Sequence, residues 1–328
     1  MFWFVVLIYL WLYVLRNFAL LVSNMMRKLR EDWKRKGYGY ELVGETVCDL
    51  SYADDVLLVA RTKEEMAEML QDLVKTSSEY GMKLNWDPKK TKVMDLRGRR
   101  RSAVRVVANG EIREVPVVME AEYLGRYFSA GGGGDEAVER RIQKAWGAFW
   151  ANELALCNFS VPFGKRFRHL SQTVGAVLTY GLESVELTKT QLERLRGVRR
   201  SMMRKTWGMR WEAVSTEMVY EDWIRMTTSR MEDEVDWMGE ARWEEAAAAR
   251  KFRWAGHLVR RGTERRTKRI LVATERSTRA KRGKPKQRWK DTMEGLVGVD
   301  WQQTAENREW WQFFGREVHG WIRSRLNK

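Results

Sequence analysis

The stretch Tyr52-Ala53-Asp54-Asp55 (YADD) places two adjacent carboxylates between two short apolar runs. Residues 46–51 before it and 56–60 after it are predicted as strands, so the acidic pair would lie on a tight hairpin turn. Such a pair suits a divalent metal ion, because hard cations take carboxylate oxygens and neutralise charge during phosphoryl transfer. On these four residues alone, an ordinary acidic surface turn is the simpler interpretation, since aspartate is favoured in turns. The order of the elements that follow favours the metal site.

Beyond the acidic turn, the sequence predicts one amphipathic helix and several strands. Thr62 and Glu65 have the form of a capping box that opens a helix, and Gly81 is placed to end it. Asn109-Gly110 is a strong hairpin signal. The expected strands span residues 83–85, 91–96, 104–108, 111–118 and 120–129, before a glycine run at 131–134. Residues 40–130 are therefore expected to form a strand-rich α+β unit.

From Asp135 onward the apolar period becomes helical. Apolar side chains recur at the spacing of one helical face, at Val138, Ile142, Ala145 and Phe149. Long amphipathic stretches continue to about residue 249, which predicts a helical domain. Five tryptophans of this region are expected to pack between helices, because buried aromatic rings dominate core energetics. They are Trp207, Trp211, Trp223, Trp237 and Trp243.

The positive charge of the chain is concentrated in one tract. The chain has 328 residues and a formal net charge of +16. Residues 251–290 hold 16 Lys and Arg against two acidic residues. This distribution is typical of a protein with a polyanionic partner, most simply nucleic acid, although a solvated basic helix or a nuclear import signal explains it too. The two cysteines and three histidines lie far apart, which gives no zinc-module spacing and favours a reducing compartment.

The N-terminus is strongly apolar. Residues 1–15 contain no charged side chain, but as a helix they would reach only about 22 Å, short of the roughly 30 Å hydrocarbon core. Basic residues follow between Arg27 and Lys36, so a single-pass anchor through residues 1–22 is one alternative under the positive-inside rule. A buried or truncated helix is the preferred interpretation.

In this order, the motifs resemble the C-terminal half of a reverse transcriptase from non-long-terminal-repeat (LINE-type) retrotransposons. The acidic turn matches the family's palm motif with its metal-binding aspartates. Gly81-Met82-Lys83-Leu84-Asn85, followed by Lys90-Thr91-Lys92, matches the next palm motif, and Tyr123-Leu124-Gly125 matches the primer-grip turn. Residues 145–149, 180–183 and 195–204 resemble thumb and post-thumb helices. Residues 254–261 and 283–289 resemble two C-terminal motifs of these elements.

The resemblance implies an α+β fold in four segments. An apolar helix (1–36) precedes a partial polymerase palm, which is an antiparallel sheet with a helix (37–130). A helical thumb and post-thumb region (135–250) and a basic, helical, nucleic-acid-binding C-terminal region (251–328) follow.

The resemblance also implies roles for particular residues. Asp54 and Asp55 would bind metal, Lys90 would act as a general acid, and Tyr123, Leu124 and Gly125 would position the primer. An RNA template and a DNA primer are the implied partners. Contacts to nucleic acid are expected in the basic tract from Arg279, Lys281, Arg282, Lys284, Lys286, Arg288 and Trp289.

The sequence also departs from this family. Such a polymerase clamps its metals between the aspartate pair and a third carboxylate on an earlier palm strand, but the first acidic residue here is Glu31. The nucleotide-pocket motif and the fingers are not recognisable either. Mg²⁺ is therefore expected only if another chain or exon supplies the missing carboxylate.

We accordingly expect a truncated RNA-directed DNA polymerase that is inactive alone, located in the nucleus or cytoplasm. Whether the chain is an enzyme stays open at this point. A non-catalytic nucleic-acid-binding remnant and a membrane-anchored adaptor are the alternatives.

Overall fold

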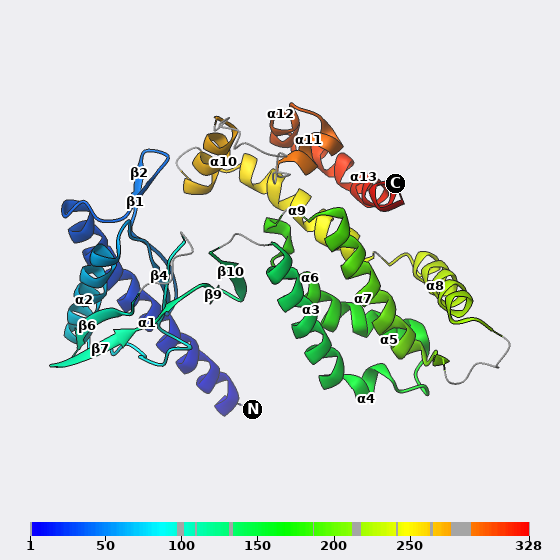
Figure 1. Cartoon of the computed structure of the whole chain (residues 1–328), viewed down its shortest axis with the longest axis horizontal. Coiled ribbons are helices and arrows are strands. Elements are labelled where there is room, and N and C mark those ends of the chain that lie inside the picture. Colours follow the sequence, from blue (N-terminus) through cyan, green and yellow to red (C-terminus); the bar gives the residue numbers. More distant parts are fainter. Residues whose placement is uncertain are drawn as a thin grey trace. The chain divides into compact units, whose positions relative to one another are not determined.

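The structure is a computed structural model that describes residues 2–96, 102–108, 110–130, 134–185, 187–211, 218–240, 242–262, 265–276 and 290–327. Within these ranges, the side chains of residues 2–17, 134, 272–276 and 325–327 fall outside the described set. The chain divides into a first unit, residues 1–133, and a second unit, residues 134–328 (Figure 1). The first mixes helices with small, mostly antiparallel sheets and the second is helical, so the predicted α+β class is confirmed.

Two helices form one side of the first unit. Helix α1 (Phe2–Arg35) contacts α2 (Lys63–Glu79). The α1 side chains that are buried recur at the spacing of one helical face: Val22, Met25, Met26, Leu29 and Trp33. They share a core cluster with Met69 and Leu73 of α2. The Trp33 indole N–H donates to the Asp72 carboxylate at 3.0 Å, so the buried ring keeps its polar atom satisfied.

Within the part of the chain that the structure describes, no helix combines the length and the apolar content that a membrane crossing requires. The predicted anchor spans residues 1–22, and the side chains of residues 1–17 are outside the described set. The membrane alternative therefore stays a prediction.

Helix α2 begins and ends where its sequence predicts. The Thr62 hydroxyl accepts a hydrogen bond from the Glu65 amide at 3.1 Å, and Gly81 leaves the helix with φ +70°, a conformation that glycine adopts without a steric penalty. The predicted capping box is only half formed. The Glu65 carboxylate accepts from the Gly39 and Arg61 amides instead, and thereby ties α2 to the segment after α1.

The first predicted strand, residues 46–51, is broken at Cys48. β2 (Glu45–Val47) pairs antiparallel with β1 (Tyr40–Leu42), whereas β3 (Asp49–Tyr52) pairs with β4 (Asp55–Leu58). At the break, the buried Cys48 thiol contacts the Tyr38 carbonyl at 3.3 Å, and the Cys48 carbonyl accepts from the Val59 amide at 2.7 Å. The chain thus changes partner strand at Cys48.

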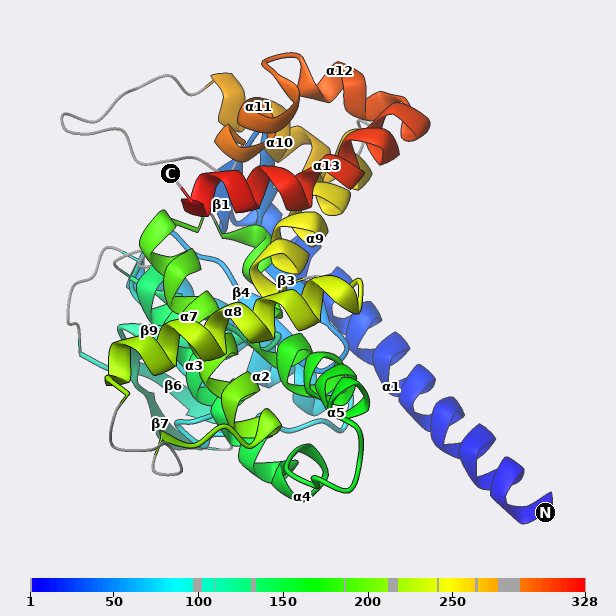
Figure 2. The ribbon, with the colours of Figure 1, turned by 90° about the vertical axis from the view of Figure 1, so that its right-hand side faces the viewer.

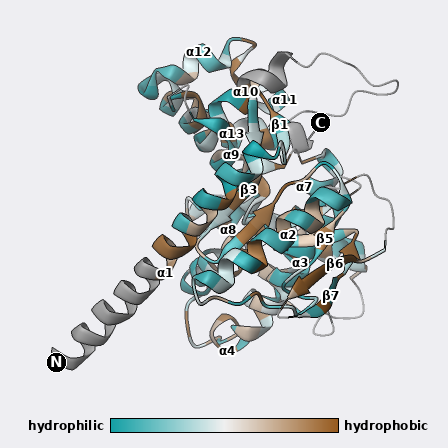
Figure 3. Cartoon of the chain, turned by 90° about the vertical axis from the view of Figure 1, so that its left-hand side faces the viewer, coloured by the Kyte–Doolittle hydropathy of each residue, from teal (hydrophilic) through white to brown (hydrophobic). Residues whose placement is uncertain are grey.

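The hairpin predicted around Gly110 is present. β6 (Val104–Ala108) pairs with β7 (Glu111–Val115), and Asn109 in the turn lies outside the described residues. Alternate residues of β6 are buried against α2, and β6 takes the hydrophobic colour in Figure 3. The Gln71 side chain of α2 bonds both the carbonyl (2.7 Å) and the amide (2.8 Å) of Val107, so α2 covers one edge of this sheet.

Four further strand predictions need correction, those over 83–85, 91–96, 111–118 and 120–129. Residues 83–85 form no strand, and within 91–96 only β5 (Val93–Met94) is a strand, parallel to β8 (Val117–Val118). Pro116, which has no N–H to donate, separates β7 from β8. The single strand expected over 120–129 is two strands, β9 (Glu120–Tyr123) and β10 (Arg126–Ser129). Leu124 (φ +49°) and Gly125 (φ +71°) form the turn between them.

The second unit consists of helices whose bounds are as follows. They are α3 (Gly134–Ala151), α4 (Glu153–Leu156), α5 (Phe163–Leu170), η1 (Ser171–Gly175), α6 (Ala176–Thr179), η2 (Leu182–Ser184), α7 (Lys189–Trp207), α8 (Tyr220–Trp237), α9 (Trp243–Val259), α10 (Arg266–Arg276), α11 (Asp291–Val297), α12 (Trp301–Glu306) and α13 (Arg308–Asn327). α13 packs against α9, as Figure 2 shows.

Two hydrophobic cores fill the second unit. The apolar face predicted for α3 lies in the first core, where Val138, Ile142, Ala145 and Phe149 are all buried. Helix α9 adds Trp243 and Ala247 to that core, and Phe252 and Leu258 to the second core formed with α11, α12 and α13.

The tryptophan prediction is right in part. Trp223 and Trp243 are buried, and Trp207 packs on the first core. The prediction that Trp237 packs between helices is wrong, because this side chain at the end of α8 is 82% exposed.

Candidate functional site

The acidic stretch lies on the β3–β4 hairpin. Tyr52 pairs with Asp55, so Ala53 and Asp54 form a two-residue loop. Ala53 has φ +53°, a left-handed conformation that costs a non-glycine residue roughly 1–2 kcal/mol. Residues 51–55 are all exposed, and neither the Asp54 nor the Asp55 side chain makes a hydrogen bond or ion pair with a described residue. The two carboxylates therefore project into solvent on a strained turn.

A third carboxylate of this hairpin, that of Asp49, is buried and already has hydrogen-bond partners. The Asp49 side chain, at the start of β3, accepts from Arg30 Nε at 2.7 Å and Arg30 Nη2 at 2.9 Å. The Ser51 hydroxyl donates to the same carboxylate at 2.6 Å. The hydrogen bond to Asp49 raises the pKa of Arg30, which keeps the guanidinium charged.

The Arg30–Asp49 pair attaches β3 to α1 and was not predicted from the sequence. A charged residue between Cys48 and Leu50 in a predicted strand is the signal that could have indicated a buried partner.

The predicted primer-positioning turn lies against the acidic hairpin. The Tyr123 hydroxyl, at the end of β9, donates to the Leu50 carbonyl of β3 at 2.9 Å. Burial raises the pKa of Tyr123, and the negative charges of Asp55 and Asp49 raise it further. Residues separated by about seventy positions in sequence are thus close enough to interact electrostatically.

No described contact holds Lys90 near the β3–β4 hairpin. It lies in the loop between α2 and β5, where its amide donates to the Asp87 carbonyl at 2.7 Å, and its side chain is exposed. No described hydrogen bond or ion pair joins Lys90 to Asp54 or Asp55. The predicted basic residues Arg279, Lys281, Arg282, Lys284, Lys286 and Arg288, together with Trp289, lie outside the described residues.

The metal-binding capacity of the hairpin follows from its donors. Among the residues that the structure describes, no group of three or more His, Cys, Asp or Glu could hold a metal ion. Asp54 and Asp55 alone offer the hard oxygen ligands that suit Mg²⁺, which proteins commonly hold through one or two carboxylates together with substrate phosphates. The pair fits a site that substrate or another carboxylate completes.

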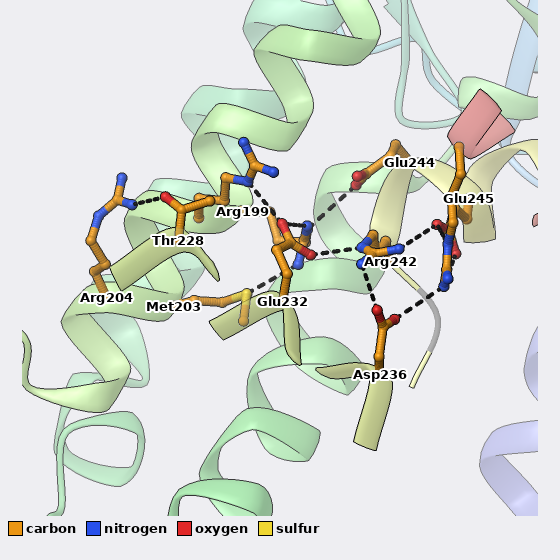
Figure 4. Close-up of polar contacts among 11 residues, drawn as sticks. Arg199, Met203, Arg204, Thr228, Glu232, Asp236, Arg242, Glu244 and Glu245 are labelled. Atoms are coloured by element: carbon orange, nitrogen blue, oxygen red, sulfur yellow. Dashed lines mark hydrogen bonds and ion pairs between the residues drawn. The ribbon is translucent and has the colours of Figure 1, made fainter. Parts of the chain in front are cut away.

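A second polar cluster, in the second unit, was not predicted (Figure 4). Arg199 of α7 is fully buried and lies between Glu232 of α8 (2.5 Å) and Glu244 of α9 (3.4 Å). Arg242 contacts Glu232 at 2.6 Å and Glu245 at 3.3 Å. The sequence signal is an arginine on the otherwise apolar face of α7, between the buried residues Leu195 and Met203.

Two carboxyl groups of this cluster have strongly shifted pKa values. Burial alone would raise the pKa of Glu232, but Arg199, Arg242 and Arg200 outweigh it and lower the value to about 2. Burial opposes ionisation of Glu245 as well, and its partners His319, Arg323 and Arg242 lower its pKa to about 2. Since these arginines have carboxylate partners, the cluster joins α7, α8, α9 and α13 through ion pairs.

Comparison with known proteins gives two similarities. Residues 17–128 match the reverse transcriptase (RNA-dependent DNA polymerase) family, a range that runs from α1 to β10 and includes Asp54, Asp55 and Tyr123. A transposon-derived protein of Caenorhabditis elegans is 29% identical over 280 residues, which cover 82% of this chain and 95% of the relative. Residues 17–128 are thus similar to the reverse transcriptase family, and most of the chain is similar to a transposon-derived protein.

Proposed function

We propose that this chain provides the palm and the following thumb-like part of a reverse transcriptase of the non-long-terminal-repeat type. The observation that carries this is the hydrogen bond from Tyr123 to Leu50, since it joins the turn at 123–125 to the strand that leads into Asp54 and Asp55. A polymerase needs its primer-positioning turn and its metal ligands on one rigid support, because misplacement by 1 Å is costly for catalysis. The helical region 135–250 would follow as the thumb.

In this proposal Asp54 and Asp55 hold Mg²⁺, which supplies charge neutralisation for phosphodiester formation when bound. Lys90 acts as the general acid once nucleotide is present, and residues 123–125 support the primer strand. The ligands are an RNA template and a DNA primer. Free thiols at Cys48 and Cys157 support a location inside the cell, in a reducing compartment.

We further propose that the chain alone does not polymerise DNA. Two exposed carboxylates bring two negative charges to the site, whereas Arg30 already neutralises Asp49. A two-metal site requires a further carboxylate, so a second chain or additional sequence must supply one.

Primer extension with the purified chain tests this directly. With an oligo(dT) primer on poly(rA), Mg²⁺ and dTTP, the wild-type chain is expected to incorporate no more nucleotide than Asp54→Asn. Synthesis that depends on Asp54 would overturn the proposed inactivity and establish the polymerase activity.

Metal binding at the turn is tested separately, by titrating Mn²⁺ as a paramagnetic substitute and measuring the free ion by electron paramagnetic resonance. Asp54→Asn and Asp55→Asn should each weaken binding. The matched control is Asp300→Asn, an exposed aspartate whose side chain makes no cap hydrogen bond. Equal binding by all three variants would exclude the turn as a metal site.

A further inference from the structure

The outer face of the C-terminal half of α9 differs from the rest of the helix. Its inner face is buried in the second core with α12 and α13, through Phe252, Ala255, Leu258 and Val259. The side chains of the outer face are exposed and are basic or aromatic. They are Arg253, Trp254 and His257 of α9, with Arg260 and Arg261 directly after its end, and we call them the α9 strip.

An exposed tryptophan lies near the N-terminal end of the α9 strip, next to Arg253. Trp254 is 39% exposed, although an indole is among the side chains that gain most from burial. Arg253 directly precedes it, and Arg261 follows seven residues later, just after the end of α9. The His257 ring accepts from Arg261 Nε at 3.1 Å through Nε2, which orients that guanidinium on the surface.

The arginines of the α9 strip have no counter-ions among the residues that the structure describes. Neither Arg253, Arg260 nor Arg261 forms an ion pair with a described carboxylate. At the other end of the same helix, Arg242 is paired with Glu232 and Glu245. Arg260 donates to the Ala305 carbonyl of α12 at 2.6 Å, so only Arg253 and Arg261 lack a described partner that ties them to another helix.

Positively charged side chains also lie close to one another in and beside the α9 strip. Burial lowers the pKa of Arg260, and the positive charge of Arg308 lowers it further. Burial likewise lowers the pKa of Arg250. The negative charge of Glu183 acts in the opposite direction, and the positive charge of Arg253 lowers the pKa further. Repulsion between neighbouring cations disfavours this arrangement unless an anion lies against it.

We propose that the α9 strip binds single-stranded nucleic acid, with one base stacked on the Trp254 indole and adjacent phosphates bound by Arg253 and Arg261. An unpaired base offers its face to an aromatic ring, whereas a base inside a duplex does not, so the exposed indole favours a single strand. The proposal deepens the proposed function and rests on it for the class of ligand. The competing explanation is a solvated basic helix end, since positive side chains are favoured near a helix C-terminus.

The test measures binding of the full chain to a fluorescein-labelled 20-nucleotide single-stranded RNA, and to a duplex of the same length, by anisotropy. Trp254→Leu keeps the buried contacts of the side chain and removes stacking. It should weaken binding to the single strand by roughly 5- to 100-fold while changing duplex binding little. Trp254→Tyr should retain most of the affinity, because a phenol ring still stacks.

The arginines are tested by salt dependence. For a single strand, each phosphate contact contributes about 0.7 to the slope of log K against log salt. The double variant Arg253→Gln, Arg261→Gln should therefore flatten the slope by about 1.4. Matched controls come from α8, where Trp237 is 82% exposed and the Arg225 side chain is 81% exposed. Trp237→Leu and Arg225→Gln should leave affinity and slope unchanged.

The outcomes separate the two proposals. If the wild-type chain binds the single strand and Trp254→Leu binds it equally well, or no more weakly than Trp237→Leu, the α9 strip is not the site while the proposed function stands. An unchanged salt slope in the double arginine variant would equally overturn the α9 strip. If the wild-type chain binds neither single strand nor duplex, the nucleic-acid ligands of the proposed function are themselves refuted.

Discussion

Tyr123 and Leu50 connect the two turns of the candidate site. The Tyr123 hydroxyl donates to the Leu50 carbonyl at 2.9 Å, so the β9–β10 turn is bonded to the strand that carries the acidic pair four residues later. The raised pKa of Tyr123, caused first by burial and then by Asp55 and Asp49, keeps the phenol protonated and hence able to donate. One hydroxyl therefore couples the positions of two turns, each of which contains a non-glycine residue at positive φ, Ala53 and Leu124.

Tyr123→Phe should uncouple these turns. Loss of one hydrogen bond costs about 0.5–1.5 kcal/mol, so local opening should become roughly 2- to 10-fold more frequent. Hydrogen exchange followed by mass spectrometry should show faster exchange in peptides covering residues 49–58 and 120–129. Tyr52→Phe is the matched control, because Tyr52 is 67% exposed and its hydroxyl makes no described hydrogen bond. Equal exchange in both variants would show that the bond does not hold the turns together.

Arg30→Met should destabilise the first unit strongly. It would leave the Asp49 carboxylate buried without its cation, and breaking a buried pair in this way costs roughly 3 kcal/mol or more. Urea unfolding followed by circular dichroism measures the loss. Arg35→Met is the control, since Arg35 pairs with Asp32 at the surface with 79% of its side chain exposed, and should change stability by less than about 0.5 kcal/mol.

A second substitution shows whether the destabilisation by Arg30→Met arises from the unpaired charge on Asp49 or from lost packing. Arg30→Met combined with Asp49→Leu removes both charges and should recover much of the stability. If the double variant is as unstable as Arg30→Met alone, the charge left on Asp49 is not the cause.

The sequence predicted the parts of this site that depend on local chemistry. Thr62 and Gly81 delimit α2 because a cap and a left-handed exit are properties of single residues. It failed where the structure depends on distant residues or on strain. Nothing local to Leu124 indicates φ +49°, so one strand was expected in place of β9 and β10.

The partners of buried charges could not be predicted for a related reason. Arg30 and Asp49 lie on different elements, and only the packing of α1 against β3 brings them together. The same holds for Arg199, whose carboxylate partners come from α8 and α9. A sequence shows that such charges need partners without showing which ones they find.

Stability of the second unit should fall in acid because of its carboxylates. The pKa values of Glu232 and Glu245 are lowered in the folded state from an ordinary 4.5 to about 2. A lowered pKa contributes stability that is present above pH 4.5 and is lost as the pH falls toward 2. Thermal unfolding followed by circular dichroism should therefore show a melting temperature that drops across this window.

Glu232→Gln isolates the contribution of one carboxylate to this acid effect. It should lower the melting temperature at pH 7 and make it less dependent on pH between 4.5 and 2. Glu193→Gln is the control, because Glu193 is half exposed and pairs with Lys189 on one helix. If both variants retain the wild-type acid dependence, the loss of stability arises elsewhere.

Gly256 should be irreplaceable in α9 because of the helix that crosses it. A Cβ at this position would overlap the Trp311 indole of α13 and lie 2.9 Å from Arg260 Nη1. The indole cannot move away freely, since its N–H donates to the Phe252 carbonyl at 3.0 Å and its ring stacks on Phe252 with centroids 3.9 Å apart. Gly256→Ala should therefore destabilise the second unit by about 1–3 kcal/mol, measured by urea unfolding.

The opposite sign is expected at Gly197 of α7, where a Cβ would meet no atom within 4 Å. There, Gly197→Ala should stabilise the helix by roughly 0.5–1 kcal/mol, because alanine loses less backbone entropy than glycine in a helix. Trp311→Leu in the Gly256→Ala background should restore part of the loss by making room for the new methyl group. If Gly256→Ala is as stable as Gly197→Ala, α13 does not pack on α9 at this position. The α9 strip would then not be the face of α9 that points away from α13.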